Sequence, residues 1–118
     1  MPEQLTFNLI THNQRNSDYD ELNIECDGIR VGKVRGIINS KVLTICSINI
    51  FPEFEGRGFA RKTIEMFKKS FDTIIADRVR YKAIGFWEKM EFDTANNGSY
   101  VWKKPAARMI SKSSMVKS

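Results

Sequence analysis

One stretch of this 118-residue chain decides its fold, and it reads Ile48-Asn49-Ile50-Phe51-Pro52-Glu53-Phe54-Glu55-Gly56-Arg57-Gly58-Phe59-Ala60-Arg61. The pattern predicts a strand over 48–51, then a proline and a short loop with two glycines, then the start of an amphipathic helix. The first turn of a helix exposes backbone N–H groups without intrahelical partners and carries a partial positive charge. Because glycines let a ligand approach the backbone closely, this layout is typical of a phosphate-binding loop.

Two familiar nucleotide-binding patterns are excluded for this stretch. No GKS or GKT follows the glycines, as a Walker loop requires, and their spacing differs from the GxGxxG of dinucleotide-binding folds. Arg57 and Arg61 would add positive charge at the rim of an anion site. A plainer interpretation stays open, in which Gly56 and Gly58 only allow a tight turn from strand to helix.

The surrounding sequence predicts one α/β domain over residues 1–104 with the element order ββββαβαββ. Strands are expected at 5–10, 21–26, 29–38, 42–51 and 73–76, followed by a closing hairpin within 91–104. The strands 21–26, 29–38 and 42–51 should form an antiparallel meander, with Asp27-Gly28 suited to a type I′ turn. Residues 11–20 are expected to form a polar loop. Gly32 and Gly36 indicate bulges or a close backbone approach in the third strand.

Two helices are expected in the second half of the chain. Two sets of apolar residues recur at the spacing of a helix. They are Ala60, Ile64, Phe67 and Phe71 in the first, and Val79, Ala83, Trp87 and Met90 in the second. Between them, the apolar run 73–76 is typical of a strand buried on both faces. A strand that follows a helix is most simply parallel to the strand before it, so the sheet should be mixed (α+β).

Composition and charge narrow the class of protein. With 42% hydrophobic and 28% charged residues, the chain is neither disordered nor fibrous. No apolar stretch is long enough to span a membrane, and residues 1–14 do not form a leader, so a cytoplasmic protein without a membrane partner is expected.

Cys26 and Cys46 lack the spacing of a zinc site, and no metal is expected. The net charge of +5 is concentrated in the second half and favours an anionic partner. Residues 105–118 are expected to be a basic, flexible tail.

Two segments together resemble the GNAT superfamily of N-acetyltransferases. Residues 55–60, EGRGFA, are similar to the pyrophosphate loop of that family, Q/R-x-x-G-x-G/A, and residues 83–92 are similar to its second signature, A-x-x-F-Y-E-K-x-G-F. The two motifs occur in the family's order, separated by one helix and one strand. The resemblance spans roughly residues 21–104.

The resemblance implies a GNAT-like sheet whose fourth and fifth strands, 42–51 and 73–77, part to admit the pantetheine arm of acetyl-CoA. It also implies transfer of the acetyl group to an amine, with the acceptor unknown. The residues expected to bind this cosubstrate are Ile48, Asn49, Ile50, Gly56, Arg57, Gly58, Phe59, Ala60, Arg61, Phe86 and Trp87. Among them, the backbone of 48–50 would pair with the pantetheine amides and the N–H groups of 57–61 would hold the pyrophosphate.

Several residues depart from the family pattern, and no catalytic residue is assigned. Glu55 places a negative charge where the family prefers Gln or Arg, and Trp87 replaces the tyrosine that usually protonates the leaving thiolate. Tyr81 and Tyr100 are more simply interpreted as packing aromatics. The strand 42–51 lacks the glutamate that often acts as general base, which leaves a water chain, a neutral amine or a carboxylate such as Glu53.

A cysteine and a histidine are two further side chains with the capacity for chemistry. Cys46 has no partner base in the sequence and is more simply a small buried side chain. His12, the single histidine, lies in a polar segment and is expected at the surface.

The segment between the first two strands is the third departure. It holds about ten polar residues where the family inserts two helices, so the acceptor side should be open. An open site suits a protein acceptor, a homodimer that completes the pocket, or no acceptor at all.

Two alternative functions are therefore compatible with the sequence. The first is a catalytically silent CoA-binding or protein-interaction module of the same fold. The second is a nucleic-acid-binding domain with Arg78, Arg80 and Lys82 as phosphate contacts, or with these residues near the CoA phosphates. Nucleic acid is the less favoured partner because both expected helices carry acids as well as bases.

Overall fold

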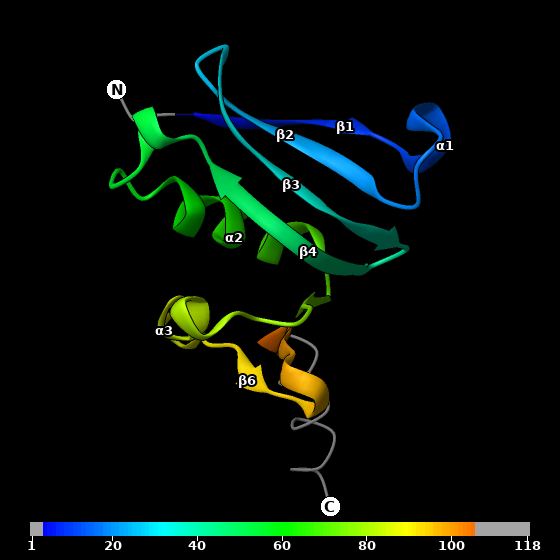
Figure 1. Ribbon diagram of the computed structural model, residues 1–118, viewed down its shortest axis with the longest axis vertical. Helices are drawn as coiled ribbons and strands as arrows, with labels where there is room; N and C mark the ends of the chain where they lie inside the picture. The colour runs from blue at the N-terminus through cyan, green and yellow to red at the C-terminus, as the bar shows by residue number, and fades with distance from the viewer. Residues whose placement is uncertain (1–3, 106–118) are drawn as a thin grey trace, which may run out of the picture.

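A computed structural model describes residues 4–105 of the chain. Within these residues, seven strands form one sheet in the order β1-β2-β3-β4-β5-β7-β6 (Figure 1). The strands are β1 (Leu5–Ile10), β2 (Asp20–Cys26), β3 (Ile29–Asn39), β4 (Val42–Ile50), β5 (Thr73–Ala76), β6 (Asp93–Thr94) and β7 (Tyr100–Lys103). The helices are α1 (His12–Arg15), α2 (Phe59–Ser70) and α3 (Ile84–Lys89), with single 3₁₀ turns η1 (Pro52–Phe54), η2 (Tyr81–Ala83) and η3 (Asn96–Gly98).

Strands β2, β3 and β4 form the antiparallel meander that the sequence predicts. Strand β1 extends it by pairing antiparallel with β2. In the β2–β3 turn, both Asp27 and Gly28 have positive φ, +53° and +83°, which confirms a type I′ hairpin. The β3–β4 register shifts next to Gly36, and a Cβ at Gly36 would clash with the carbonyl oxygen of Thr44. Both expectations for this glycine, a bulge and a close approach, are therefore met.

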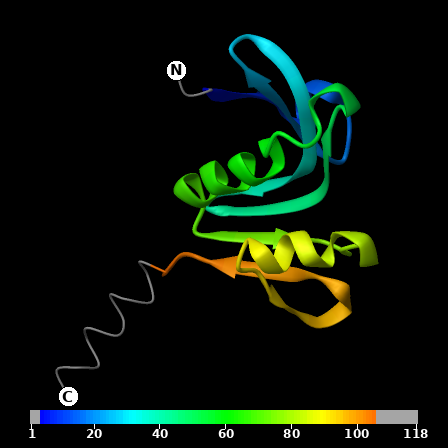
Figure 2. The ribbon, with the colours of Figure 1, turned by 90° about the vertical axis from the view of Figure 1, so that its left-hand side faces the viewer.

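Helix α2 packs on one face of the sheet and closes the main core (Figure 2). Its buried side chains are Phe59, Thr63, Ile64 and Phe67. The expected apolar face is thus correct at Ile64 and Phe67, but Ala60 is only half-buried and Phe71 follows the last helical residue. Across the layer, the rings of Phe67 and Phe7 are 5.0 Å apart.

Strand β5 is parallel to β4, as predicted, but the two pair over only four residues. Ile74 and Ala76 are buried while the alternate residues Thr73 and Ile75 are half-buried, so burial on both faces was wrong. The helix expected over 79–90 is also shorter, because Arg80 is extended (ψ 150°) and α3 begins only at residue 84. Lys68 of α2 donates a hydrogen bond to the Met90 carbonyl, which ties α3 to α2.

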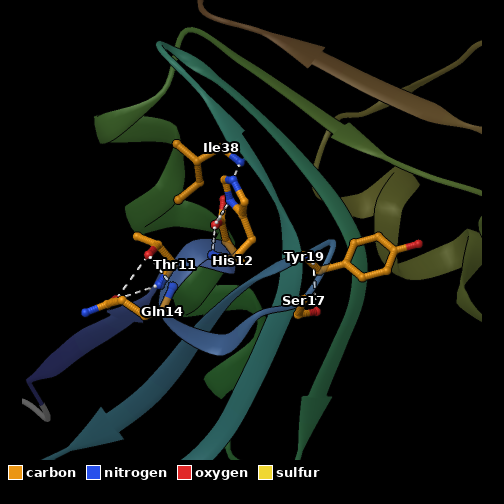
Figure 3. Close-up of polar contacts among 7 residues, drawn as sticks. Thr11, His12, Gln14, Ser17, Tyr19 and Ile38 are labelled. Carbon is orange, nitrogen blue, oxygen red and sulfur yellow. Dashed lines mark hydrogen bonds and ion pairs between the residues drawn. The ribbon is translucent and has the colours of Figure 1, made fainter.

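The expected polar loop at 11–20 contains the short helix α1 instead. Thr11 and Gln14 form a capping box around its first turn, as Figure 3 shows. The buried carboxylate of Asp20 accepts hydrogen bonds from the His12 backbone N–H (2.7 Å), the Ile38 N–H (3.0 Å) and, at 2.8 Å, contacts His12 Nδ1. Burial acts to raise the pKa of Asp20, but these hydrogen bonds outweigh it and lower the pKa below its usual 3.8.

The expectations about the cysteines, membrane spans, metal ligands and the tail are tested only within the described residues. Cys26 is buried, Cys46 is half-buried, and no disulfide joins the two. Within residues 4–105, no helix is long and apolar enough to cross a membrane, and no cluster of three metal-ligating side chains occurs there. The expected tail lies outside the described residues beyond position 105, and the domain limits stay a prediction.

Candidate functional site

The candidate site begins where β4 and β5 part. The Asp77 N–H donates to the Ile45 carbonyl at 2.9 Å, and beyond this point β4 pairs only with β3 as far as Ile50. The Phe51 N–H donates to the Val31 carbonyl on β3 at 2.8 Å. Because backbone groups alternate along a strand, the N–H and C=O groups of Ile48 and Ile50 face the open edge, while those of the intervening residue face β3.

The N-terminus of α2 lies beside this open edge. Gly58 is the N-cap with φ +81° and offers no side-chain cap. The first hydrogen bond of the helix runs from the Lys62 N–H to the Gly58 carbonyl at 3.0 Å. The N–H groups of residues 59–61 therefore precede the intrahelical ladder, and the helix dipole adds positive potential where they emerge.

A cavity of about 490 Å³ joins these two features, and we call it the α2 cavity. Its lining residues are Ile48, Asn49, Ile50, Phe54, Glu55, Gly56, Gly58, Phe59, Ala60, Arg61 and Phe86. Among the residues predicted to bind the cosubstrate, only Arg57 and Trp87 are not part of this lining. Arg57 instead lies over the Phe54 ring, 5.6 Å from its centroid.

Two of the lining residues change the sequence-based interpretation. Phe54 was missed, because its position inside the η1 turn has no periodicity that would mark it as a wall residue. Glu55 lines the cavity, so its negative charge lies at the wall, where Arg61 provides an opposite charge. The backbone of Asn49 faces β3, so this residue can contribute its side chain but not its peptide groups.

A second cavity of about 430 Å³ occupies the fork between the strands, and we call it the β4–β5 cavity. It is lined by Ile45, Cys46, Ser47, Ile48, Asn49, Ala76, Asp77, Arg78, Val79, Arg80, Ala83 and Trp87. Both cavities share residues 48 and 49, so they meet at the free edge of β4. Trp87 is 4% exposed and is held between Phe86 and Phe92, at ring distances of 5.0 and 4.8 Å.

The groups considered for acid–base chemistry lie mostly elsewhere. Tyr81 is 89% exposed, so its interpretation as a packing aromatic is wrong, whereas Tyr100 is buried in the core as expected. Neither tyrosine lines either cavity, and Glu53 lines neither of them. Cys46 does line the fork, but burial, together with the negative charge of Asp77, raises the pKa of its thiol. The thiol is thus kept protonated, which disfavours a nucleophilic role.

Asp77 is the acidic side chain that the sequence analysis missed. It follows directly after β5, contacts Arg78 Nε at 3.6 Å, and accepts a hydrogen bond from Ser99 Oγ at 3.4 Å. A polar residue just after a buried strand was the available signal. Arg78 and Arg80 line the fork and not the α2 cavity, while Lys82 lines neither. The structure therefore does not bring these three cations together with the α2 N-terminus.

Comparison with solved structures identifies the fold. The N-acetyltransferase YlbP of Bacillus subtilis in complex with coenzyme A matches with a TM-score of 0.63 at 16% identity, covering 86% of this chain and 97% of that chain. An acetyltransferase from Thermus thermophilus matches with a TM-score of 0.61 at 18% identity, covering 77% and 69%. The ribosomal-protein-S18-alanine N-acetyltransferase of Escherichia coli matches with a TM-score of 0.57 at 11% identity, covering 83% and 91%.

These likenesses establish that the chain has the GNAT fold, as the sequence resemblance predicted. The described residues form a seven-stranded mixed sheet with few helices, which matches that fold. No family model matches the sequence, and no curated protein is similar to it in sequence.

Proposed function

We propose that this chain is a GNAT-superfamily N-acetyltransferase that binds acetyl-CoA in the α2 cavity and transfers the acetyl group to an amine. One observation carries the proposal: the uncapped N-terminus of α2 and the free edge of β4 open onto the same cavity. The first feature suits a diphosphate, and the second suits an extended chain of amides. The fold adds support, because structures of the same fold include acetyltransferases in complex with coenzyme A.

The residues present fit such a ligand at both ends. At the helix, the N–H groups of residues 59–61 precede the intrahelical ladder, and a Cβ at Gly58 would meet no atom within 4 Å. Along the strand, Ile48 and Ile50 offer alternating donors and acceptors at the spacing of an added strand. Glu55 opposes the binding of a diphosphate, and Arg61 on the same wall offsets it.

The reaction is a direct transfer between thioester and amine. Acetyl-CoA supplies an activated acyl group: the amine nitrogen forms a bond to the carbonyl carbon, the carbon–sulfur bond breaks, and the amine's proton ends on the CoA thiol. The chain's own contribution is to orient the acyl group with edge N–H groups of β4, which can donate to the carbonyl oxygen. Because the indole of Trp87 is not an acid near neutral pH, we assign no general acid.

A second candidate function is a catalytically silent CoA-binding or protein-interaction module. Trp87 favours it, since it stands where the family's proton donor is expected and lines the fork. A homodimer that completes the acceptor side stays a prediction.

One experiment separates the two functions. The full chain is titrated calorimetrically with acetyl-CoA, and thiol release is then followed across a panel of amines. Binding with thiol release that depends on one acceptor supports the enzyme, while binding without release across the panel supports the silent module. Absence of binding at millimolar acetyl-CoA contradicts the enzyme and a CoA-binding module, and it leaves only the protein-interaction module.

A further inference from the structure

The β4–β5 cavity has an excess of positive charge that the proposed function does not explain. Its charged lining residues are Asp77, Arg78 and Arg80. Asp77 is already paired with Arg78, and its side chain is 35% exposed against 82% for the arginine. In the described part of the chain, no acidic side chain lies within ion-pair distance of Arg80, so the cavity keeps an excess of positive charge.

A third arginine adds to this field from the neighbouring strand. Arg35 of β3 pairs in register with Ser47 of β4, which lines the cavity. The positive charges of Arg35 and Arg78 both act on the thiol of Cys46, which lines the cavity. Within residues 4–105, Arg35 also has no acidic side chain at ion-pair distance.

The wall that carries Arg78 and Arg80 is held in place by the backbone. The Asp77 N–H is bonded to Ile45 on β4, and the Val79 N–H donates to the Gly98 carbonyl at 2.9 Å. Between these two anchors, Arg78 adopts φ +46°, a left-handed conformation that favours glycine. A fixed wall places the cations before a ligand arrives, which lowers the entropic cost of binding.

We propose that the β4–β5 cavity binds the acceptor, and that this acceptor is an amine with a carboxylate close to the reacting nitrogen. The inference rests on the proposed function, because the cavity adjoins the α2 cavity at residues 48 and 49. Arg80 binds the carboxylate, the charge of Arg35 adds to the attraction, and the amine is thereby oriented toward the thioester. A polyamine, which carries only positive groups, is disfavoured by the same cations, because Asp77 already contacts Arg78.

Two sources present this chemistry: a free amino acid, through its α-carboxylate, and a peptide with an acidic residue at its amino terminus. Both are tested as the acetylated product, which binds without turnover. The probes are N-acetylalanine, which has only an α-carboxylate, N-acetyl-Asp-Ala-Ala-amide, which has only a side-chain carboxylate, and N-acetylputrescine, which is cationic. Each is titrated calorimetrically into the full chain with and without CoA.

The expected result is that one of the two anionic probes binds at least tenfold more tightly than N-acetylputrescine, and the tighter of the two identifies the source. Arg80→Glu should weaken that probe at least tenfold and leave the CoA affinity within twofold. Lys82→Glu is the matched control, since it makes the same charge change two residues away on an exposed side chain outside both cavities.

Equal or tighter binding of N-acetylputrescine overturns the inference, and so does anionic binding that survives Arg80→Glu unchanged. The CoA titration is read separately. Failure to bind CoA contradicts the proposed function, whereas an Arg80-dependent anionic preference in the absence of CoA still supports the acceptor site.

Discussion

The Lys62 N–H donates to the carbonyl of Gly58 at 3.0 Å, and this hydrogen bond sets where α2 begins. The N–H groups of residues 59–61, which precede this bond in the helix, are therefore free to bind a ligand. Gly58 itself can occupy the N-cap only because its φ of +81° carries little steric cost for glycine. The two residues thus define the anion-binding end of the candidate site.

Replacement of Gly58 tests this end of the site. Gly58→Leu should lower the affinity for acetyl-CoA at least tenfold, because the side chain enters the space in front of the free N–H groups. The matched control is Gly28→Leu, at an exposed turn with φ +83° and equally open surroundings. Both variants should lose about 1–2 kcal/mol of stability to the left-handed backbone, but only the first should lose affinity by calorimetry. If both variants bound acetyl-CoA with the same affinity, the ligand would have to bind elsewhere.

Trp87 tests whether the missing proton donor limits the reaction. Trp87→Tyr places a hydroxyl at the wall of the fork, and general acid catalysis contributes about 100-fold or more. We therefore expect acetyl transfer to rise by about that factor, measured as acceptor-dependent thiol release. Trp87→Phe removes similar volume without adding a hydroxyl and should not raise the rate. If the tyrosine and phenylalanine variants transfer acetyl at the same rate, the absence of a proton donor at position 87 does not limit the reaction.

The buried carboxylate of Asp20 should make stability depend on pH. Its pKa is lower in the folded chain than in the unfolded chain, so its contribution is complete above the unfolded pKa and is lost as pH falls through the folded pKa. Asp20→Asn should therefore cost about 2 kcal/mol in urea unfolding at pH 7, and the difference should shrink below pH 4.

Asp72→Asn is the control for that measurement. Its side chain is 53% exposed and lies 3.6 Å from Lys104 Nζ, so the exposed pair should contribute less than about 0.5 kcal/mol. A pH-independent difference between Asp20→Asn and the unmodified chain would contradict an ionised Asp20.

Thr63 offers a stabilising substitution. It is fully buried in α2, and its Oγ1 has no hydrogen-bond partner among the described residues. Thr63→Val keeps the shape and removes the unpaired hydroxyl, so stability in urea should rise by about 1 kcal/mol. Thr63→Ser keeps the hydroxyl and deletes a methyl group, and it should destabilise the chain by a similar amount. A loss of stability in the valine variant would show that the hydroxyl has a partner.

The sequence could predict the part of the candidate site that lies within one continuous stretch of the chain. The α2 cavity could be located from residues 48–61, since a strand, two glycines and a helix start lie within one continuous stretch. Asp77, Arg78 and Arg80 could not be joined to it, because their approach to β4 depends on where the pairing of β5 ends. Phe54 was missed for a related reason: a single 3₁₀ turn has no periodicity that distinguishes a cavity wall from solvent.

The sequence by itself determined the meander, the crossover helix and the loop at its start, because turn residues and apolar spacing act over a few neighbours. Only the tertiary structure decided that four residue pairs hold β4 to β5, that Trp87 closes the fork, and that Tyr81 points to solvent. These features arise from contacts between segments about 30 residues or more apart in the chain, and such packing overrides local preference.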